Sequence, residues 1–315
     1  MGNRDVSIDM CKGLGMLLVV LGHLPFLFCS VIYSFHMGFF FILSGWCFSD
    51  RHLQNGKGYF FSRFIRLFVP YLIMRIIAKL AEFLEGGKEA FEQYHLIGTS
   101  WFLVALFGLS ILSWFAIKVV KRFEANIWIL PLLFFGLALA FDLLDVINIT
   151  IIFSLSTWCY FTFYFLLGYC LKNKCSDITV YKALDVSKYI LLTGGLLVLI
   201  LAKGFIPTTI NDCTSISFLP YAITTIIGSY ITLSLVLYLK EKNVFCDFLS
   251  LIGRNNMSIL LLQWPCISLI EYLFVNEYLG LTNPTLITIA KFLSAISIPV
   301  ILSCSFDVLK NRIKR

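Results

Sequence analysis

The stretch DMCKGLGMLLVVLGHLPFLFCSVIYSFHMGFFFILSG, residues 9–45, decides how this chain folds and where its chemistry lies. It consists of two apolar runs that meet near residues 29–30, and each run carries one histidine. An ionisable side chain inside a membrane-spanning helix is costly to insert, so it marks a functional site by default. If the runs form a helical hairpin, His23 and His36 lie at the same depth, roughly 9–10 Å below one membrane face. The two rings can then face each other.

The rest of the chain is equally apolar. Of its 315 residues, 59% are hydrophobic and 16% aromatic, and the mean hydropathy is +0.88, which exceeds the apolar share of ordinary soluble domains. About ten runs approach the roughly 17–25 residues that a helix needs to cross a bilayer. They cover 13–29, 31–49, 64–83, 100–119, 126–145, 151–171, 188–204, 218–239, 257–276 and 285–306. We expect an all-α, polytopic integral membrane protein, with one membrane-embedded domain over 1–315 and no soluble domain.

The net charge of +7 does not indicate a nucleic-acid partner, because of where the basic residues fall. With both termini assigned to the cytoplasm, most of the 25 Lys and Arg residues lie on cytoplasmic segments or helix ends. The outer loops instead carry acids such as Glu85, Glu89 and Asp142. This distribution follows the positive-inside rule. It predicts a protein of the cytoplasmic membrane with both termini in the cytoplasm.

Polar residues mark one face of the first helix. Asp9, Lys12 and His23 share a stripe at helical spacing, and Lys12 lies three turns, about 16 Å, from His23 along the axis. Pro25 lacks a backbone donor and predicts a bend at His23. A neutral histidine held away from water can accept a proton from a hydroxyl, or attack an acyl group itself. The alternative interpretation is that His23 and His36 only bond neighbouring helices.

A basic pair follows in SRFIRLFVPYL, residues 62–72. Arg63 and Arg66 stand one helical turn apart, so their guanidinium groups can converge on one anion. Contact with the phosphates of membrane lipid explains the pair equally well. Buried histidines together with an anion-binding rim suit an acyl-coenzyme A thioester, which has a polyphosphate head and a long thin arm. The ten scattered cysteines include no CxxC pair, and we expect no metal site.

Several motifs resemble those of membrane acyltransferase family 3. KGLGMLLVVLGH, residues 12–23, resembles the family's R/K-x10-H signature, and FHMGFFFILSG, residues 35–45, resembles its second-helix motif. The segment 62–72 is similar to its basic loop, and WFL at 101–103 is similar to a short block of its acetylase-like members. IGRNNMSILLLQWP, residues 252–265, resembles a late motif. The likeness runs through nearly the whole chain.

The resemblance implies a ten-helix O-acyltransferase. Its donor would be cytoplasmic acetyl-CoA or another acyl-CoA, and its acceptor a hydroxyl of a carbohydrate or cell-envelope polymer. Carried over to this chain, it implies catalytic, donor-binding and acceptor-binding groups. The catalytic group is His23, Lys12, Asp9 and His36; the donor group is Arg63, Arg66, Lys12 and Ser44; the acceptor group is Trp101 and Gln263. Gln263 stands where many relatives carry a histidine, which puts its role in question and indicates a different acceptor.

Two other interpretations stay open at this point. The first is a transporter or flippase of a sugar or lipid-linked intermediate, in which buried histidines relay protons. The chain shows no internal repeat and no paired broken helices of the kind common in transporters, which counts against it. The second is a noncatalytic relative, suggested only by Gln263. The sequence does not give the acceptor, the acyl chain length or the oligomeric state.

Overall fold

The structure is a computed structural model, and it describes residues 5–24, 29–77, 101–144, 154–174, 194–195, 215–275 and 283–313. Every regular element in these ranges is a helix, as the apolar composition predicts. The chain forms two compact units. Unit 1 comprises Met1–Phe39, Ile178–Ile210 and Pro220–Arg315, and unit 2 comprises Phe40–Asp177 and Asn211–Leu219.

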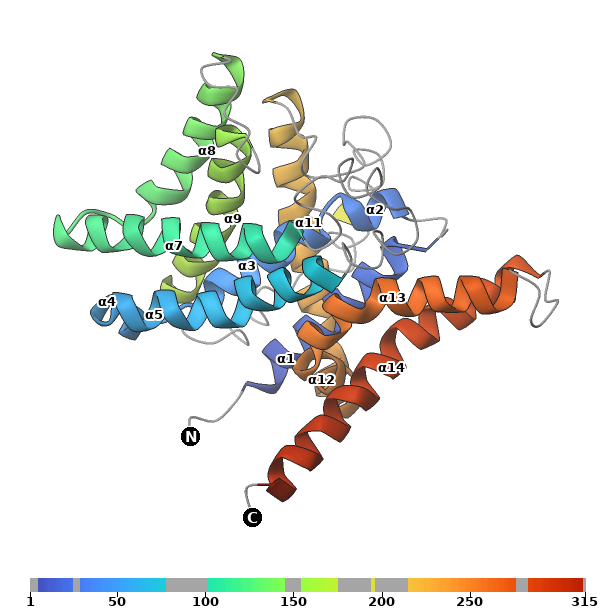
Figure 1. Cartoon of the computed structure of the whole chain (residues 1–315). Helices are drawn as coiled ribbons and strands as arrows, with labels where there is room; N and C mark the ends of the chain where they lie inside the picture. Colours follow the sequence, from blue (N-terminus) through green and yellow to red (C-terminus); the bar gives the residue numbers. More distant parts are fainter. Residues whose placement is uncertain are drawn as a thin grey trace, which may run out of the picture. The chain divides into compact units, whose positions relative to one another are not determined.

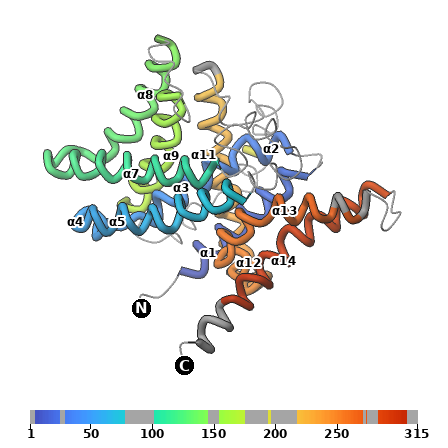
Figure 2. The backbone as a smooth tube through the Cα atoms, in the orientation of Figure 1, coloured from blue at the N-terminus to red at the C-terminus, as the bar shows by residue number. Residues whose placement is uncertain are grey.

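Unit 1 contains the N-terminal and C-terminal helices (Figure 1). They are α1 (Val6–Gly22), α2 (Cys29–Tyr33), α12 (Cys246–Arg254), α13 (Asn256–Val275) and α14 (Pro284–Ile313), with most of α11 (Ser215–Glu241) and the start of α3 (His36–Trp46). Helices α13 and α14 run side by side, which the tube in Figure 2 traces. The polar N-terminal start of α1 is capped by Asp5, whose carboxylate accepts a hydrogen bond from the Ser7 backbone N–H at 2.8 Å.

Two glycines bring α1 and α12 of unit 1 into backbone contact. A Cβ at Gly13 would lie 2.0 Å from the carbonyl oxygen of Leu249, and a Cβ at Gly253 would lie 1.8 Å from that of Asp9. Small residues at a crossing allow two helix backbones to approach this closely. The contact fixes the N-terminal part of α1, which carries Asp9 and Lys12. The sequence analysis did not predict α12, since its residues precede the ninth apolar run.

Unit 2 contains α4 (Arg51–Gln54), α5 (Gly56–Arg63), the π-helical turn η1 (Phe64–Phe68), α7 (Trp101–Arg122), α8 (Ile129–Leu143) and α9 (Leu155–Lys174). Helices α8 and α9 pack side by side, and α7 packs against both α9 and η1. Residues 69–77 continue helically beyond η1. This unit also holds the end of α3.

Basic helix ends of unit 2 converge on the corner that follows α3. Lys121 near the end of α7 pairs with the Asp50 carboxylate at 2.5 Å, and the Tyr169 hydroxyl of α9 donates to the same carboxylate at 2.6 Å. Lys172 donates to the Phe48 carbonyl at 2.8 Å. The ends of α3, α7 and α9 therefore share one face of unit 2, as an antiparallel arrangement of successive spans requires.

Membrane character is clear from the described helices. Those long and apolar enough to span a bilayer are Cys29–Trp46, Trp101–Arg122, Ser217–Glu241 and Pro284–Phe306, and shorter apolar helices cover Ile129–Leu143 and Asn256–Ile270. The predicted span 188–204 lies outside the described residues except for 194–195, and the predicted span 64–83 is described only to residue 77. The chain is an α-helical membrane protein, and the number ten stays a prediction.

Candidate active site

His23 lies at the C-terminal end of α1. The helix ends at Gly22, and the His23 backbone N–H donates to the carbonyls of Val19 and Val20 at 3.3 and 3.2 Å. The prediction from Pro25 placed a bend at this position; Pro25 itself is outside the described residues. Because the helix stops here, the imidazole projects from the end of α1 instead of lying along its flank.

Tyr33 lies between the two histidines predicted as catalytic. Its hydroxyl is 3.2 Å from Nδ1 of His23, and the two ring centroids are 6.3 Å apart. On the other side, its ring meets that of His36 edge to face, with centroids 5.2 Å apart and planes at 73°. In the structure, both histidines contact the side chain of Tyr33. The sequence analysis missed Tyr33, although it precedes His36 by about one helical turn.

The hydrogen bond of His36 fixes its tautomer. Its side chain is 2% exposed, and Nδ1 lies 2.7 Å from the carbonyl oxygen of Ile32. A carbonyl oxygen can only accept, so Nδ1 carries the proton. In the neutral ring, Nε2 of His36 is then left with a lone pair. His36 is therefore a second group in this cluster that can take up a proton.

A break between α2 and α3 presents Tyr33 and His36 to His23. Ser34 and Phe35 form a turn between the two helices, and the carbonyls there are no longer all bonded within a helix. Helix α11 supplies the missing donors: the Tyr221 hydroxyl donates to the Tyr33 carbonyl at 3.0 Å, and Thr224 Oγ1 donates to the Ser34 carbonyl at 2.8 Å. Both donors lie far along the chain from the hairpin, so sequence reasoning did not connect them.

Helix α13 closes the other side of His23. The Trp264 ring lies 4.9 Å from the His23 ring, centroid to centroid, with the planes tilted by 47°. The neighbouring Gln263 is 1% exposed, and its Oε1 has no hydrogen-bond partner among the described residues. A buried, unpaired amide oxygen carries a desolvation cost of about 1–3 kcal/mol. This oxygen is consequently available to a ligand that donates a hydrogen bond.

The predicted partners of His23 on α1 lie toward the start of the helix. Asp9 is buried, and its backbone forms part of the crossing with α12. Lys12 is partly exposed. The α1 helix is continuous from Val6 to Gly22, so eleven residues at about 1.5 Å each separate Lys12 from His23. The structure therefore does not bring Lys12 into contact with His23.

The arginine pair of unit 2 lines a cavity of about 460 Å³. The lining residues are Cys47, Arg51, His52, Asn55, Gly58, Tyr59, Ser62, Arg63 and Arg66. The Arg63 guanidinium stacks over the Tyr59 ring at 5.1 Å, which orients it toward the cavity wall. None of these lining residues is acidic. Arg63 and Arg66 therefore line one cavity together with Arg51 and His52, and their convergence on one anion stays a prediction.

Electrostatics make this cavity suited to an anion. Burial lowers the pKa of His52, and the charges of Arg63, Lys172 and Arg66 lower it further, so the ring is neutral near pH 7. Burial alone would raise the pKa of Asp50, but its hydrogen bonds from Lys121 and Tyr169 bring it below the usual value. The Asp50 carboxylate is therefore ionised and already paired with Lys121. Among the residues that the structure describes, no ion pair neutralises the arginines that line the cavity.

Two further predicted site residues have local partners in unit 2. The Ser44 hydroxyl donates to the Phe40 carbonyl of its own helix at 2.8 Å. The Trp101 ring packs near Phe161 and Phe102, with centroids 5.8 and 6.2 Å away. Neither is among the residues that line the arginine cavity. The described residues contain no group of His, Cys, Asp and Glu side chains that could hold a metal ion.

Comparison with known proteins gives one family match over most of the chain. The model of acyltransferase family 3, described as "Acyltransferase domain", matches residues 5–304. The nodulation protein NolL of Sinorhizobium fredii (strain NBRC 101917 / NGR234) is similar at 32% identity over 136 residues, which cover 35% of this chain and 36% of the relative. The match therefore spans about a third of that relative's length. No solved structure matches.

Proposed function

Because the chain belongs to acyltransferase family 3, we propose that it is an integral membrane O-acyltransferase that uses cytoplasmic acyl-CoA. It moves an acetyl or other short acyl group to a hydroxyl of a carbohydrate or cell-envelope acceptor. The observation that carries this proposal most is the contact between His23 Nδ1 and the Tyr33 hydroxyl. A histidine held at one nitrogen by a fixed partner presents the other nitrogen for proton transfer.

His23 acts as the general base in this proposal. When the Tyr33 oxygen accepts a hydrogen bond from Nδ1–H of His23, Nε2 of the neutral ring keeps its lone pair and takes the proton of the acceptor hydroxyl. The acceptor oxygen then bonds to the acyl carbon, and the bond from that carbon to the coenzyme sulfur breaks. The leaving thiolate takes the proton from Nε2, which restores the neutral imidazole. The same histidine can instead carry the acyl group itself between the two substrates.

The arginine cavity of unit 2 supports the choice of donor. Coenzyme A carries several phosphate groups, and guanidinium groups bind phosphates through charge-assisted, often bidentate hydrogen bonds. Arg63 and Arg66, with Arg51, give the cavity three such groups. The basic helix ends that surround it fit the cytoplasmic side by the positive-inside rule. Acceptor binding is assigned to Gln263, whose buried oxygen has hydrogen-bonding capacity to spare, and to Trp101.

The experiment is acetyl-CoA binding and hydrolysis by the purified full-length chain in detergent. Wild type is expected to bind acetyl-CoA and cleave it slowly. His23→Ala should bind with an unchanged Kd and cleave about 100-fold more slowly or worse, because the general base is gone. Arg63→Ala and Arg66→Ala should each weaken binding about tenfold, and more at low salt. Arg122→Ala, an exposed arginine outside the cavity, is the matched control.

Cleavage by His23→Ala at the wild-type rate would remove His23 from the mechanism. An unchanged affinity for acetyl-CoA in both arginine variants would mean that Arg63 and Arg66 contact lipid phosphates or set the membrane orientation instead of binding the coenzyme. If the wild-type protein binds no acyl-CoA at all, the donor assignment fails, and substrate flux into vesicles without any acyl donor becomes the next measurement.

A further inference from the structure

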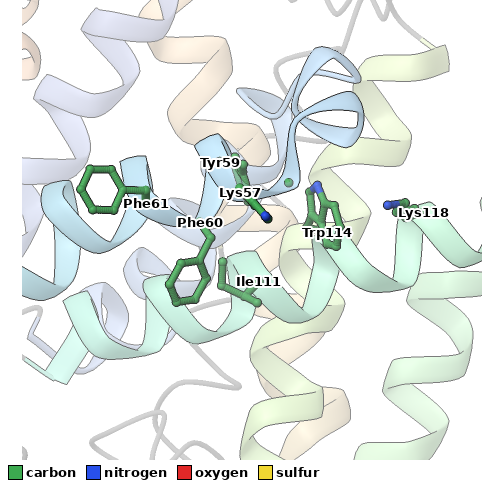
Figure 3. A pocket seen from close by; sticks show the side chains of 8 residues that line it. Lys57, Tyr59, Phe60, Phe61, Ile111, Trp114 and Lys118 are labelled. Atoms are coloured by element: carbon green, nitrogen blue, oxygen red, sulfur yellow. The ribbon is translucent and has the colours of Figure 1, made fainter.

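An open groove lies on the other side of α5 from the arginine cavity. Its volume is about 730 Å³, and it is lined by Gly56, Lys57, Tyr59, Phe60, Phe61, Ile111, Trp114 and Lys118. We call it the lysine groove. Figure 3 shows its lining: Phe60 of α5 approaches Ile111 of α7, and Lys57 and Lys118 flank Trp114. Tyr59 lines both the lysine groove and the arginine cavity, so the two share a wall.

One end of the lysine groove is cationic. The ammonium group of Lys118 lies over the Trp114 ring, 4.7 Å from its centroid, and the Lys57 side chain of α5 points toward the Trp114 side of the groove in Figure 3. No acidic residue is among the lining residues. Lys57 and Lys118 both line the groove beside Trp114, and neither lysine has an ion-pair partner among the described residues. This end is complementary to an anion.

The other end of the groove is apolar and open. Phe60 is 49% exposed and Phe61 63% exposed, and Ile111 continues the surface along α7. Since α7 is one of the helices long and apolar enough to span a membrane, its exposed apolar side chains face hydrocarbon. Its last turn carries Lys121 and Arg122, which belong at the headgroup level. The groove thus joins a cationic end to an exposed apolar end.

The Trp114 wall of the groove is held in place. The indole Nε1–H donates to the His52 carbonyl at 2.9 Å, which joins α7 to α4. Gly56 faces the same ring, and a Cβ there would lie 2.6 Å from the indole. The groove therefore depends on a fixed tryptophan opposite a residue without a side chain.

We propose that the lysine groove binds one anionic phospholipid. Lys57 and Lys118 bind its phosphate at the Trp114 end of the groove, and one acyl chain follows Phe60, Phe61 and Ile111. A free phosphate would use only the cationic end and would leave the apolar lining uncovered. An amphiphile with a negative head matches both ends, and anionic lipids are attracted to basic groups at the membrane surface. This assignment goes beyond acyl transfer and does not depend on it.

The test measures lipid binding at Trp114 directly. The full-length protein is placed in bilayers of phosphatidylcholine with increasing amounts of brominated phosphatidylglycerol or brominated phosphatidylcholine, and quenching of tryptophan fluorescence is recorded. Subtracting the signal of Trp114→Phe isolates the quenching at this ring. We expect brominated phosphatidylglycerol to quench this component with at least about fivefold higher apparent affinity than brominated phosphatidylcholine. In Lys57→Gln/Lys118→Gln the ratio should fall to about one.

Arg122→Gln/Lys174→Gln removes the same charge from exposed positions outside the groove and should keep the wild-type ratio. A ratio unchanged in the lysine double variant, or lowered equally in the control, would overturn the proposal. Acetyl-CoA binding distinguishes another occupant: if the lysine double variant loses coenzyme affinity and keeps its lipid preference, the groove belongs to the donor site. Lys57→Gln alone, with an expected partial loss of the ratio, covers the case in which the double variant does not fold.

Discussion

At the scale of single residues, Tyr33 contacts both candidate histidines, His23 through its hydroxyl and His36 through its ring. Replacing Tyr33 with Phe keeps the ring that packs against His36 and removes only the partner of His23 Nδ1. One hydrogen bond of about 1.4 kcal/mol corresponds to about a tenfold change in rate. We therefore expect Tyr33→Phe to lower kcat for acyl transfer about tenfold while the Kd for acetyl-CoA stays the same. Steady-state kinetics and equilibrium binding on the purified protein measure both quantities.

Tyr238→Phe is the matched control, because Tyr238 is an exposed tyrosine on α11. It should change neither quantity. A Tyr33→Phe enzyme with the wild-type kcat would show that the His23–Tyr33 contact does not orient the imidazole. An equal loss in Tyr238→Phe would point to a general loss of folded protein.

Single residues also show how far sequence reasoning reached. The sequence singled out His23, His36, Arg63 and Arg66 as candidates because a charged or titratable side chain in apolar sequence is visible locally. Tyr33 and Trp264 could not, since a tyrosine or tryptophan in a membrane helix is ordinary on composition alone. Their roles come from tertiary contacts that bring residues of different helices around one imidazole.

At the scale of elements, the crossing of α1 and α12 fixes the helix that carries His23. A methyl group at Gly253 would meet the backbone oxygen of Asp9, which cannot rotate away as a side chain can. Gly253→Ala should therefore destabilise the protein by about 1–3 kcal/mol, the usual cost of overpacking. The measurement is the thermal midpoint of the purified protein. Gly136→Ala, on α8 with nothing within 4 Å of the added Cβ, should leave it unchanged or slightly higher.

A thermal midpoint for Gly253→Ala equal to that of the wild-type protein would mean that α1 and α12 can move apart without loss of stability.

The elements also differ from what the sequence predicted. One apolar span was expected over 31–49, and the structure has a segment long and apolar enough to cross a bilayer at Cys29–Trp46, with a turn at Ser34 and Phe35 between α2 and α3. The turn depends on donors from α11, so no pattern within the span could reveal it. Helix α12 was not predicted, because the polar residues on either side of it are typical of a loop.

At the scale of the whole molecule, contacts within unit 2 indicate which ends of its spans lie on the same side of the membrane. Asp50, Lys121 and Lys172 hold the ends of α3, α7 and α9 at one face. A reporter that matures only in the cytoplasm should be active when inserted after Glu124 or after Lys174. It should be inactive after Leu144, at the opposite end of α8. The positive-inside rule gives the sign of this prediction.

Reporter fluorescence in intact cells, normalised to protein amount, is the measurement. Activity after Leu144 together with silence after Glu124 would invert the proposed orientation and move the arginine cavity away from cytoplasmic coenzyme. Different outcomes after Glu124 and Lys174 would contradict the shared face itself. The composition could predict membrane insertion, because it depends on a sum over many residues, and the orientation that the charge pattern indicates stays a prediction. Neither of them could divide the chain into two units.

The unpaired amide oxygen of Gln263 bears on how the enzyme would release its product. If the hydroxyl to be modified donates a hydrogen bond to this oxygen, binding of the unmodified acceptor offsets the desolvation cost of the buried oxygen. Once the hydroxyl has become an ester, it has no hydrogen left to donate. The product then loses the interaction that held the substrate, and departure becomes easier at the moment the reaction is complete. A single glutamine would in this way make the site bind the unmodified acceptor more tightly than the ester product.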